Sequence, residues 1–378
     1  MTTFSRTNIS VIGRWWLTVD RWTIAALIVL GAFGTVLAMA ASPAVAEHLG
    51  KDFFYFAKRQ LLFLGPATVL MLALSLLSEQ GIRRVSLAVL AASFALMALV
   101  LLYGTEIKGA TRWISFAGIT LQPSEFMKPA FIVLSAWMFT QWRLTRDLAA
   151  FVFAIAVYGA AMALLLAQPD VGMALLVSMV WAVQFFLAGL PMMLVIGIGV
   201  LFVAGGIGAY LKFDHVHQRI DRFLDPQGQE AYQVARSLEA FRNGGIYGVG
   251  PGEGQVKAVL PDAHADFVFA VVGEEFGLIP ALLIVAVFGF VVLRGFGRVF
   301  KSPNLFAQLA VAGLLTQFAL QAIINMASTL NLMPTKGMTL PFISYGGSSM
   351  LALAIGMGMV LALTRDRPGP GLSMRGWR

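Results

Sequence analysis

Long apolar stretches separated by short polar ones dominate the chain. A membrane-spanning helix needs about 20 consecutive, mostly apolar residues, and stretches of this kind recur along the whole sequence. They predict ten transmembrane helices, at residues 22–44, 60–78, 85–103, 126–142, 148–167, 171–189, 192–211, 266–293, 305–327 and 343–364. We therefore expect an all-α polytopic membrane protein, with a ten-helix membrane domain over residues 22–364 between tails at 1–21 and 365–378.

Composition narrows the classes of protein that remain. The chain is 58% hydrophobic and 12% charged, against roughly 45–50% and 25% in a soluble domain, which excludes a water-soluble globular protein. It contains no cysteine, so disulfides and thiolate metal sites are excluded. The basic residues are spread over short loops without a basic helix, which argues against a nucleic-acid partner. Asp214, His215 and His217 match no strong metal-binding spacing.

The placement of basic residues predicts the orientation. Cytoplasmic segments near membrane helices are enriched in Lys and Arg. Two basic groups meet this rule, one before the first helix and one in a short loop: Arg6, Arg14 and Arg21, and Arg294, Arg298 and Lys301. Ten helices would return both termini to the cytoplasm. Most acidic residues then fall on the outer side, where we expect the chemistry.

Three outer segments are candidates for a working surface. The longest loop, 212–265, lies between predicted helices seven and eight and contains a short amphipathic helix from Gln229 to Phe241. Its glycine-rich part lacks a GK[ST] sequence, so a nucleotide-binding P-loop is disfavoured. Residues 104–125 are too broken by Gly and Pro to span the bilayer, and we expect them to lie at the interface or to re-enter. Residues 331–349 carry two prolines and several glycines, and we expect a cavity beside them.

Four carboxylates gather at residues 260–277, LPDAHADFVFAVVGEEFG. If a helix opens at Pro261, Asp262 and Asp266 share one of its faces. Glu274 and Glu275 follow two turns deeper in an apolar run, where ionised groups are costly and are kept facing a bundle interior or a wet cavity. They are predicted either to take part in function or to pair with Lys or Arg of a neighbouring helix.

Eight motifs stand in a characteristic order: GATRWI at Gly109, LQPSEFMKPA at Leu121, QPDVG at Gln168, FLDP at Phe223, YQ at Tyr232, GGIYGVG at Gly244, LPDAHADFVFAVVGEEFG at Leu260 and PTKGMTLPFISYGGSS at Pro334. Over nearly its whole length the chain resembles the SEDS family of bacterial cell-wall proteins. The lysine of the last motif resembles the cell-division type more than the elongation type. Asp262 stands where the family usually has Glu, and Ala265 where it usually has Thr.

The resemblance implies a peptidoglycan glycosyltransferase. Such an enzyme polymerises lipid II, the undecaprenyl-diphosphate-linked disaccharide peptide, on the outer face of the plasma (inner) membrane, here at the division septum. The implied partners are a class B penicillin-binding protein transpeptidase and other divisome membrane proteins. Asp266 corresponds to the family's essential aspartate, and we predict that it is the catalytic base for the acceptor hydroxyl.

The predicted substrate-binding residues come from the same motifs: Arg112, Trp113, Glu125, Lys128, Asp170, Asp262, Glu274 and Lys336. Arg112, Lys128 and Lys336 are candidate clamps for the diphosphate. Each could instead pair with Glu125, Asp170 or Glu274 to hold helices together. Trp113 could stack on a sugar or the lipid, or anchor the interface, and Asp170 could cap its own helix. No metal ligand is predicted, although a divalent cation, Mg²⁺ or Mn²⁺, could accompany the diphosphate.

Three alternatives remain open from the sequence. A lipid II flippase would also use buried charges and a glycine-rich gate. An elongation-type polymerase differs from a division-type one at only a few positions. A scaffold that only recruits the crosslinking enzyme would not need Asp266.

Overall fold

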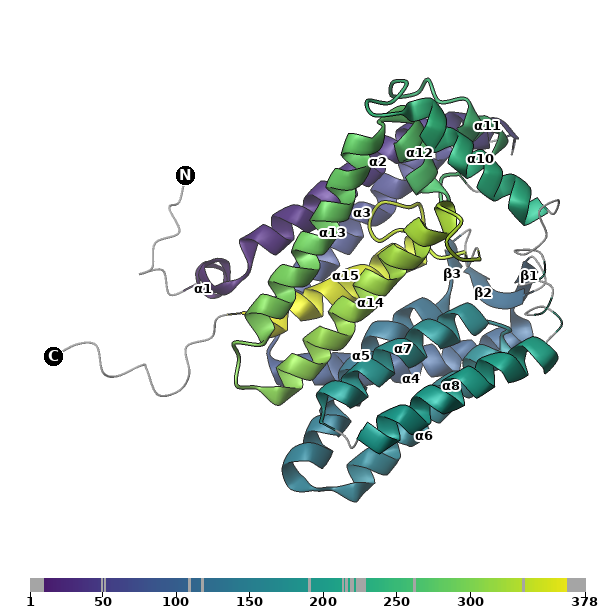
Figure 1. Cartoon of the computed structure of the whole chain (residues 1–378). Coiled ribbons are helices and arrows are strands. Elements are labelled where there is room, and N and C mark those ends of the chain that lie inside the picture. The colour runs from purple at the N-terminus through teal and green to yellow at the C-terminus, as the bar shows by residue number, and fades with distance from the viewer. Residues whose placement is uncertain are drawn as a thin grey trace.

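Long helices packed side by side form the body of the protein, with a small sheet and several short helices gathered at one end (Figure 1). The structure is a computed structural model that describes residues 10–48, 50, 52–107, 110–116, 119–189, 192–212, 214, 217, 221, 229–260, 263–334 and 337–365. Its helices are α1 (Val11–Thr18), α2 (Arg21–His48), α3 (Tyr55–Ser75), α4 (Glu79–Tyr103), α5 (Pro123–Thr145), α6 (Leu148–Ala167), α7 (Val171–Leu187), α8 (Met192–Lys212), α10 (Gln229–Gly244), α11 (Val256–Val259), α12 (Val268–Glu275), α13 (Leu278–Val299), α14 (Leu305–Thr329) and α15 (Gly347–Leu363).

Each of the ten predicted stretches coincides with helix, so the helical membrane architecture is confirmed. Among the described residues, six helices are long and apolar enough to cross a membrane: α2, α3, α4, α6, α13 and α14. Helices α7 and α15 are apolar but shorter. The number of ten crossings and the boundaries of the membrane domain and tails stay predictions.

The eighth predicted helix, 266–293, is wrong as a single element, because the structure breaks it into α12 and α13. The chain turns at Gly277, whose φ of 83° lies in the left-handed region that favours glycine. Backbone N–H groups of the preceding glycine-rich segment close the end of α12: Val249 donates to Glu274 O and Gly250 to Glu275 O, both at 3.0 Å. Hydropathy did not predict this break, because residues 266–293 are mostly apolar and the hydrogen bonds that end α12 come from another segment of the chain.

The described residues between 105 and 121 form three short antiparallel strands, which the sequence did not predict. They are β1 (Thr105–Ile107), β2 (Ala110–Phe116) and β3 (Ile119–Leu121), in the order β1-β2-β3. That this segment lies at the membrane interface or re-enters the bilayer stays a prediction. The sheet lies at the same end of the bundle as α10, α11 and α12 (Figure 1). We call this end the sheet end, and the opposite one the α1 end.

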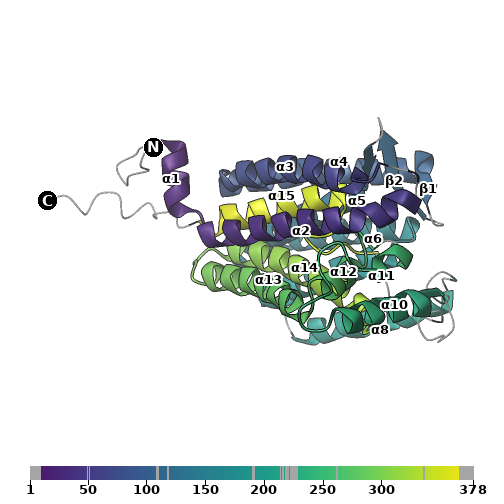
Figure 2. The ribbon, with the colours of Figure 1, turned by 90° about the horizontal axis from the view of Figure 1, so that it is seen from above.

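At the α1 end, side-chain contacts link the first helices of the chain to the last ones. Asp20, just before α2, accepts hydrogen bonds from Arg294 Nε at 2.9 and 2.7 Å and lies 3.7 Å from Arg298. Arg298 in turn donates to Thr364 O, and Arg365 donates to Thr18 Oγ1 at 3.2 Å. The first and last described segments therefore lie at the same end, with α1 running across the long helices (Figure 2). That this end is cytoplasmic stays a prediction.

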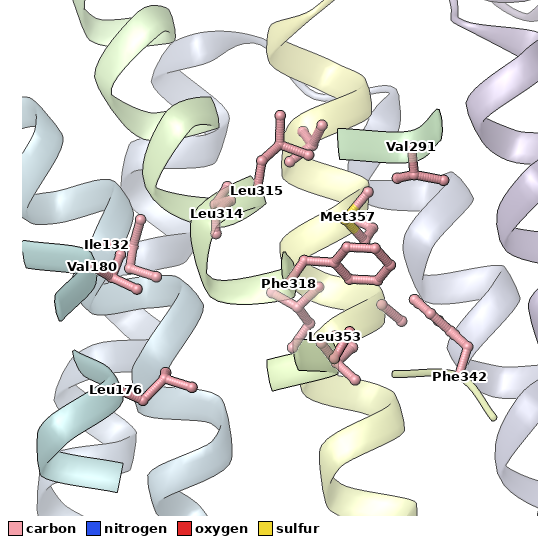
Figure 3. Close-up of a cluster of buried hydrophobic side chains, with 14 of the residues drawn as sticks. Ile132, Leu176, Val180, Val291, Leu314, Leu315, Phe318, Phe342, Leu353 and Met357 are labelled. Atoms are coloured by element: carbon pink, nitrogen blue, oxygen red, sulfur yellow. The ribbon is translucent and has the colours of Figure 1, made fainter. Parts of the chain in front are cut away.

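The core is centred on α14, which is more shielded than the other five described helices that are long enough to cross a membrane. In its most apolar stretch 72% of the residues are buried, against 22% in α6. Phe318 of α14 packs against Phe342 and lies among Leu353 and Met357 of α15 (Figure 3). Because α14 contacts protein on most sides, it can hold polar side chains that a lipid-facing helix could not.

Candidate active site

Asp266 lies at the sheet end, in the turn between α11 and α12. Residues 263–267 are turn and α12 begins only at Val268, so the helix predicted to open at Pro261 is wrong for this part. Pro261 and Asp262 lie outside the described residues. The helix face that was predicted to carry both aspartates is therefore absent at Asp266, and the role predicted for Asp262 stays a prediction.

Hydrogen bonds from other segments of the chain to three successive carbonyls fix this turn. The donors are Tyr345 N–H to His264 O (3.0 Å), Ser344 Oγ to Ala265 O (2.6 Å) and Asn325 Nδ2 to Asp266 O (2.9 Å). Carbonyls in a helix would accept from N–H groups four residues later, whereas these are occupied by α14 and the segment before α15. The turn is thus a product of tertiary contacts.

The half-buried Asp266 side chain approaches the loop that precedes α15. A Cβ placed on Gly337 would lie at an ordinary contact distance, 3.7 Å, from Asp266 Oδ2. Gly337 has a φ of 64°, and this left-handed backbone favours glycine. Lys336, the neighbour of Gly337, lies outside the described residues. Its predicted contact with the diphosphate stays a prediction.

A polar face of α14 joins this loop to the Asp266 turn. Asn325 donates from one amide nitrogen to Asp266 O (2.9 Å) and to Met338 O (2.7 Å). Gln321, one turn earlier, donates to Thr339 O (3.1 Å) and to Ser349 Oγ of α15 (3.2 Å). Residues four apart lie on the same side of a helix, so one face of α14 holds two adjacent carbonyls of the loop.

Lys128 of α5 meets the same face of α14. Its side chain is only 2% exposed, lies 2.8 Å from Glu125 Oε2, and donates to Gln321 Oε1 at 3.2 Å. The pair spans three residues of one helix, which places both side chains on one side. A continuous path of contacts therefore runs from Lys128 through Gln321 and Asn325 to the turn that carries Asp266.

Arg112 and Asp170 form a second buried ion pair at the sheet end. Arg112 Nη1 on β2 lies 3.5 Å from Asp170 Oδ1, and the same guanidinium donates to Gln168 O and Pro169 O. Asp170 also caps α7 by accepting from Met173 N at 3.3 Å. Burial raises the pKa of the Asp170 carboxyl above its ordinary value, against the opposing charge of Arg112.

The structure brings some of the predicted site residues together and separates others. Asp170 feels the charges of Glu125 and Lys128 as well as Arg112, so these four form one buried charge group. Trp113 follows Arg112 on β2, opposite Thr105 of β1. Its side chain therefore points to the other face of the sheet. The predicted ion pairs with Glu125 and Asp170 are present, but neither joins two helices, because Glu125 and Lys128 lie on one helix and Arg112 lies on a strand. The substrate-binding roles of all these residues stay predictions.

Glu274 and Glu275 hold the glycine-rich segment against α12. Glu274 Oε1 accepts from Gln255 N and Val256 N, both at 3.0 Å. Glu275 accepts from Gly252 N at 3.0 Å and pairs with Lys257, which also donates to Ala40 O of α2 at 3.0 Å. Glu275 thus pairs with a lysine of a neighbouring helix, as the structural alternative predicted, whereas Glu274 binds backbone N–H groups instead.

Sequence reasoning missed Gln321 and Asn325, although a signal was present. With Gln317 they form a polar series at four-residue spacing inside an otherwise apolar helix, which marks one face toward a protein interior. Among the described residues, no three His, Asp or Glu side chains gather in a way that could hold a metal ion. A divalent cation stays a prediction, and no step is assigned to it.

Comparisons with known proteins give a consistent picture. The family model for cell cycle proteins that covers FtsW, RodA and SpoVE matches residues 20–368. The probable peptidoglycan glycosyltransferase FtsW of Caulobacter vibrioides is 46% identical over 351 residues, covering 93% of this chain and 90% of that protein. Stage V sporulation protein E of Bacillus subtilis is 32% identical, covering 88% of this chain and 93% of that protein.

Solved structures share the fold over most of the chain. One was reported under the words "Structural coordination of polymerization and crosslinking by a peptidoglycan synthase complex"; it has a TM-score of 0.75 and 27% identity, and covers 92% of this chain and 98% of its own. The crystal structure of the rod shape determining protein RodA of Thermus thermophilus has a TM-score of 0.69 and 26% identity, covering 93% and 99%.

Proposed function

Because the chain belongs to the FtsW, RodA and SpoVE family of cell cycle proteins, we propose that it is a peptidoglycan glycosyltransferase that polymerises lipid II during septal cell-wall synthesis. The FtsW relatives, named as peptidoglycan glycosyltransferases, support the division role. The multi-pass helical fold supports a membrane location, and the basic residues before the first helix and at Arg294, Arg298 and Lys301 support our proposal that both termini lie in the cytoplasm.

The observation that carries the proposal is the polar face of α14. It links the turn of Asp266 to the buried Lys128 through Asn325, the loop before α15 and Gln321. In the proposed reaction the Asp266 carboxylate accepts the proton of the acceptor sugar hydroxyl as that oxygen bonds to the donor sugar. The bond between donor sugar and diphosphate breaks, and cationic side chains stabilise the departing anion.

Arg112, Lys128 and Lys336 are the proposed cations. Arg112 and Lys128 each lie beside a carboxylate in the structure, so binding of a diphosphate requires it to share or replace that partner. We propose further that the chain acts with a class B penicillin-binding protein transpeptidase, an inference supported by the structural neighbour from a peptidoglycan synthase complex.

The test compares wild type with Asp266→Asn in a purified complex with the transpeptidase partner, using labelled lipid II and a gel that resolves glycan chains. The substitution keeps the size of the side chain and removes the base, so we expect glycan strands from wild type and none from the variant. Asp52→Asn is the matched control, because Asp52 is an exposed acid paired with Lys58 near the start of α3.

Each outcome decides a separate point. A variant that polymerises normally shows that Asp266 is not the base. If wild type polymerises nothing with its partner, with Mg²⁺ or with Mn²⁺, the enzyme proposal is wrong. Lipid II transport across proteoliposomes then tests the flippase alternative.

A further inference from the structure

Contacts with neighbouring segments attach helix α1 to the bundle. Gly13 is buried, and Trp15 Nε1 donates to Ser75 Oγ at the end of α3 at 2.8 Å. Ser10 caps the helix by accepting from Gly13 N at 3.0 Å. An isolated eight-residue helix would be marginal in water, so these contacts, together with the Arg365 bond to Thr18, hold α1 in place.

α1 also exposes large apolar side chains. Val11 is 66% exposed and Ile12 59%, and Trp16 and Leu17 are also exposed. Trp22, at the first turn of α2, and Ile28 and Val29 further along α2 are exposed as well. Both helices therefore expose apolar side chains that the protein itself does not cover.

Exposed positive charge accompanies these apolar side chains. Arg14 and Arg21 are both exposed, and the Arg21 guanidinium lies 5.7 Å from the centre of the Trp16 ring. Within the described residues 10–25 the single acid is Asp20, which is buried and bonded to Arg294. Basic and aromatic side chains around an apolar surface are typical of helices at a membrane interface.

The direction of α1 agrees with this chemistry. α1 crosses the long helices at their end (Figure 2), so in a bilayer that these helices span it lies along the membrane surface. We propose that α1 is an interfacial helix that inserts Val11, Ile12, Trp16 and Leu17 among the lipids of the leaflet at that end. Arg14 and Arg21 bind the anionic headgroups of that leaflet. The proposal does not depend on the glycosyltransferase activity.

The experiment uses the full chain in lipid nanodiscs. The sequence has no cysteine, so Leu17→Cys provides a unique attachment point for an environment-sensitive fluorophore. Lys301→Cys, exposed in the connection between α13 and α14 at the same end, is the matched control. We expect the label at position 17 to be quenched by lipids that carry a nitroxide near the headgroup and to lose quenching by aqueous iodide. The label at 301 is expected to show the reverse.

Two other results would overturn insertion into lipid. Equal iodide quenching at 17 and 301 places the apolar side chains of α1 in water. Protection from iodide without quenching by nitroxide lipids places another protein surface, such as a second copy of the chain, over α1.

The charge is tested by exchanging phosphatidylcholine for phosphatidylglycerol. We expect phosphatidylglycerol to bind about fivefold more tightly for each arginine, equivalent to about 1 kcal/mol per charge near the surface. This preference is measured from the enrichment of phosphatidylglycerol retained by the purified protein. Arg14→Gln with Arg21→Gln should reduce the enrichment, whereas Lys58→Gln, at an exposed lysine already paired with Asp52, should not. An unchanged enrichment in the double variant refutes the headgroup assignment.

Discussion

Replacing Lys128 by Met removes one half of a buried ion pair. The Lys128 ammonium lies 2.8 Å from Glu125 Oε2, and the substitution keeps the apolar part of the side chain. Glu125 would be left in a buried site without its cation. Removing one partner of such a pair typically costs about 3–5 kcal/mol.

We therefore expect Lys128→Met to destabilise the protein by about 3–5 kcal/mol. Combining it with Glu125→Gln removes the stranded charge and should restore most of the lost stability.

The assay is the loss of folded protein in detergent on heating, followed by size-exclusion chromatography for the two single variants and the double variant. Lys58→Met is the matched control, because the Lys58–Asp52 pair is more than half exposed and such pairs are worth about 0–1 kcal/mol. A Lys128→Met protein as stable as the control, or a double variant no more stable than the single one, refutes the reasoning.

Three further predictions concern other contacts of the fold. Asn325→Leu deprives the carbonyl of Asp266 of its donor, which costs about 1–3 kcal/mol for a buried group; glycan synthesis should fall more than with Gln317→Leu, measured with the lipid II gel assay. Gly244→Val should loosen α10, because a Cβ there would lie 1.9 Å from a carbonyl of α12, and hydrogen exchange of α10 should rise. Burial raises the pKa of Asp20, but hydrogen bonds and charge from two arginines outweigh it and lower the pKa below 3.8. Its contribution is therefore present at neutral pH and lost as the pH falls below about 4, and Asp20→Asn should flatten this part of a melting-temperature profile against pH.

Hydropathy located the membrane helices well because each needs a long apolar stretch. It misplaced several helix starts, since α3 and α4 begin with polar turns, at Tyr55 and Glu79, that follow the helix but not the hydropathy. The pairs Glu125–Lys128 and Arg112–Asp170 were among the combinations that the sequence left open. Side-chain types can propose such partners, but only the packing of α5, β2 and α7 selects them.

The turn at Asp266 was beyond the reach of local sequence patterns. Proline, acidic spacing and an apolar run all favour helix there, yet donors from positions 325, 344 and 345 occupy the carbonyls. The small sheet was also not predicted from the sequence. Its strands are three to seven residues long and are shorter than the window in which an alternating pattern can be recognised.

The helices differ in how far protein shields them from lipid, and this difference determines which substitutions each helix tolerates. Most of the apolar stretch of α14 is enclosed by protein, whereas most of that of α6 faces outward. Lipid tails accept Leu, Ile, Val or Phe almost alike, so α6 can exchange these residues freely. A close-packed interior is sensitive to the shape of each side chain, so α14 cannot exchange these residues freely. Libraries for engineering should therefore vary α6 and leave α14 unchanged, because the outward-facing helices of this protein tolerate apolar substitutions better than the enclosed ones.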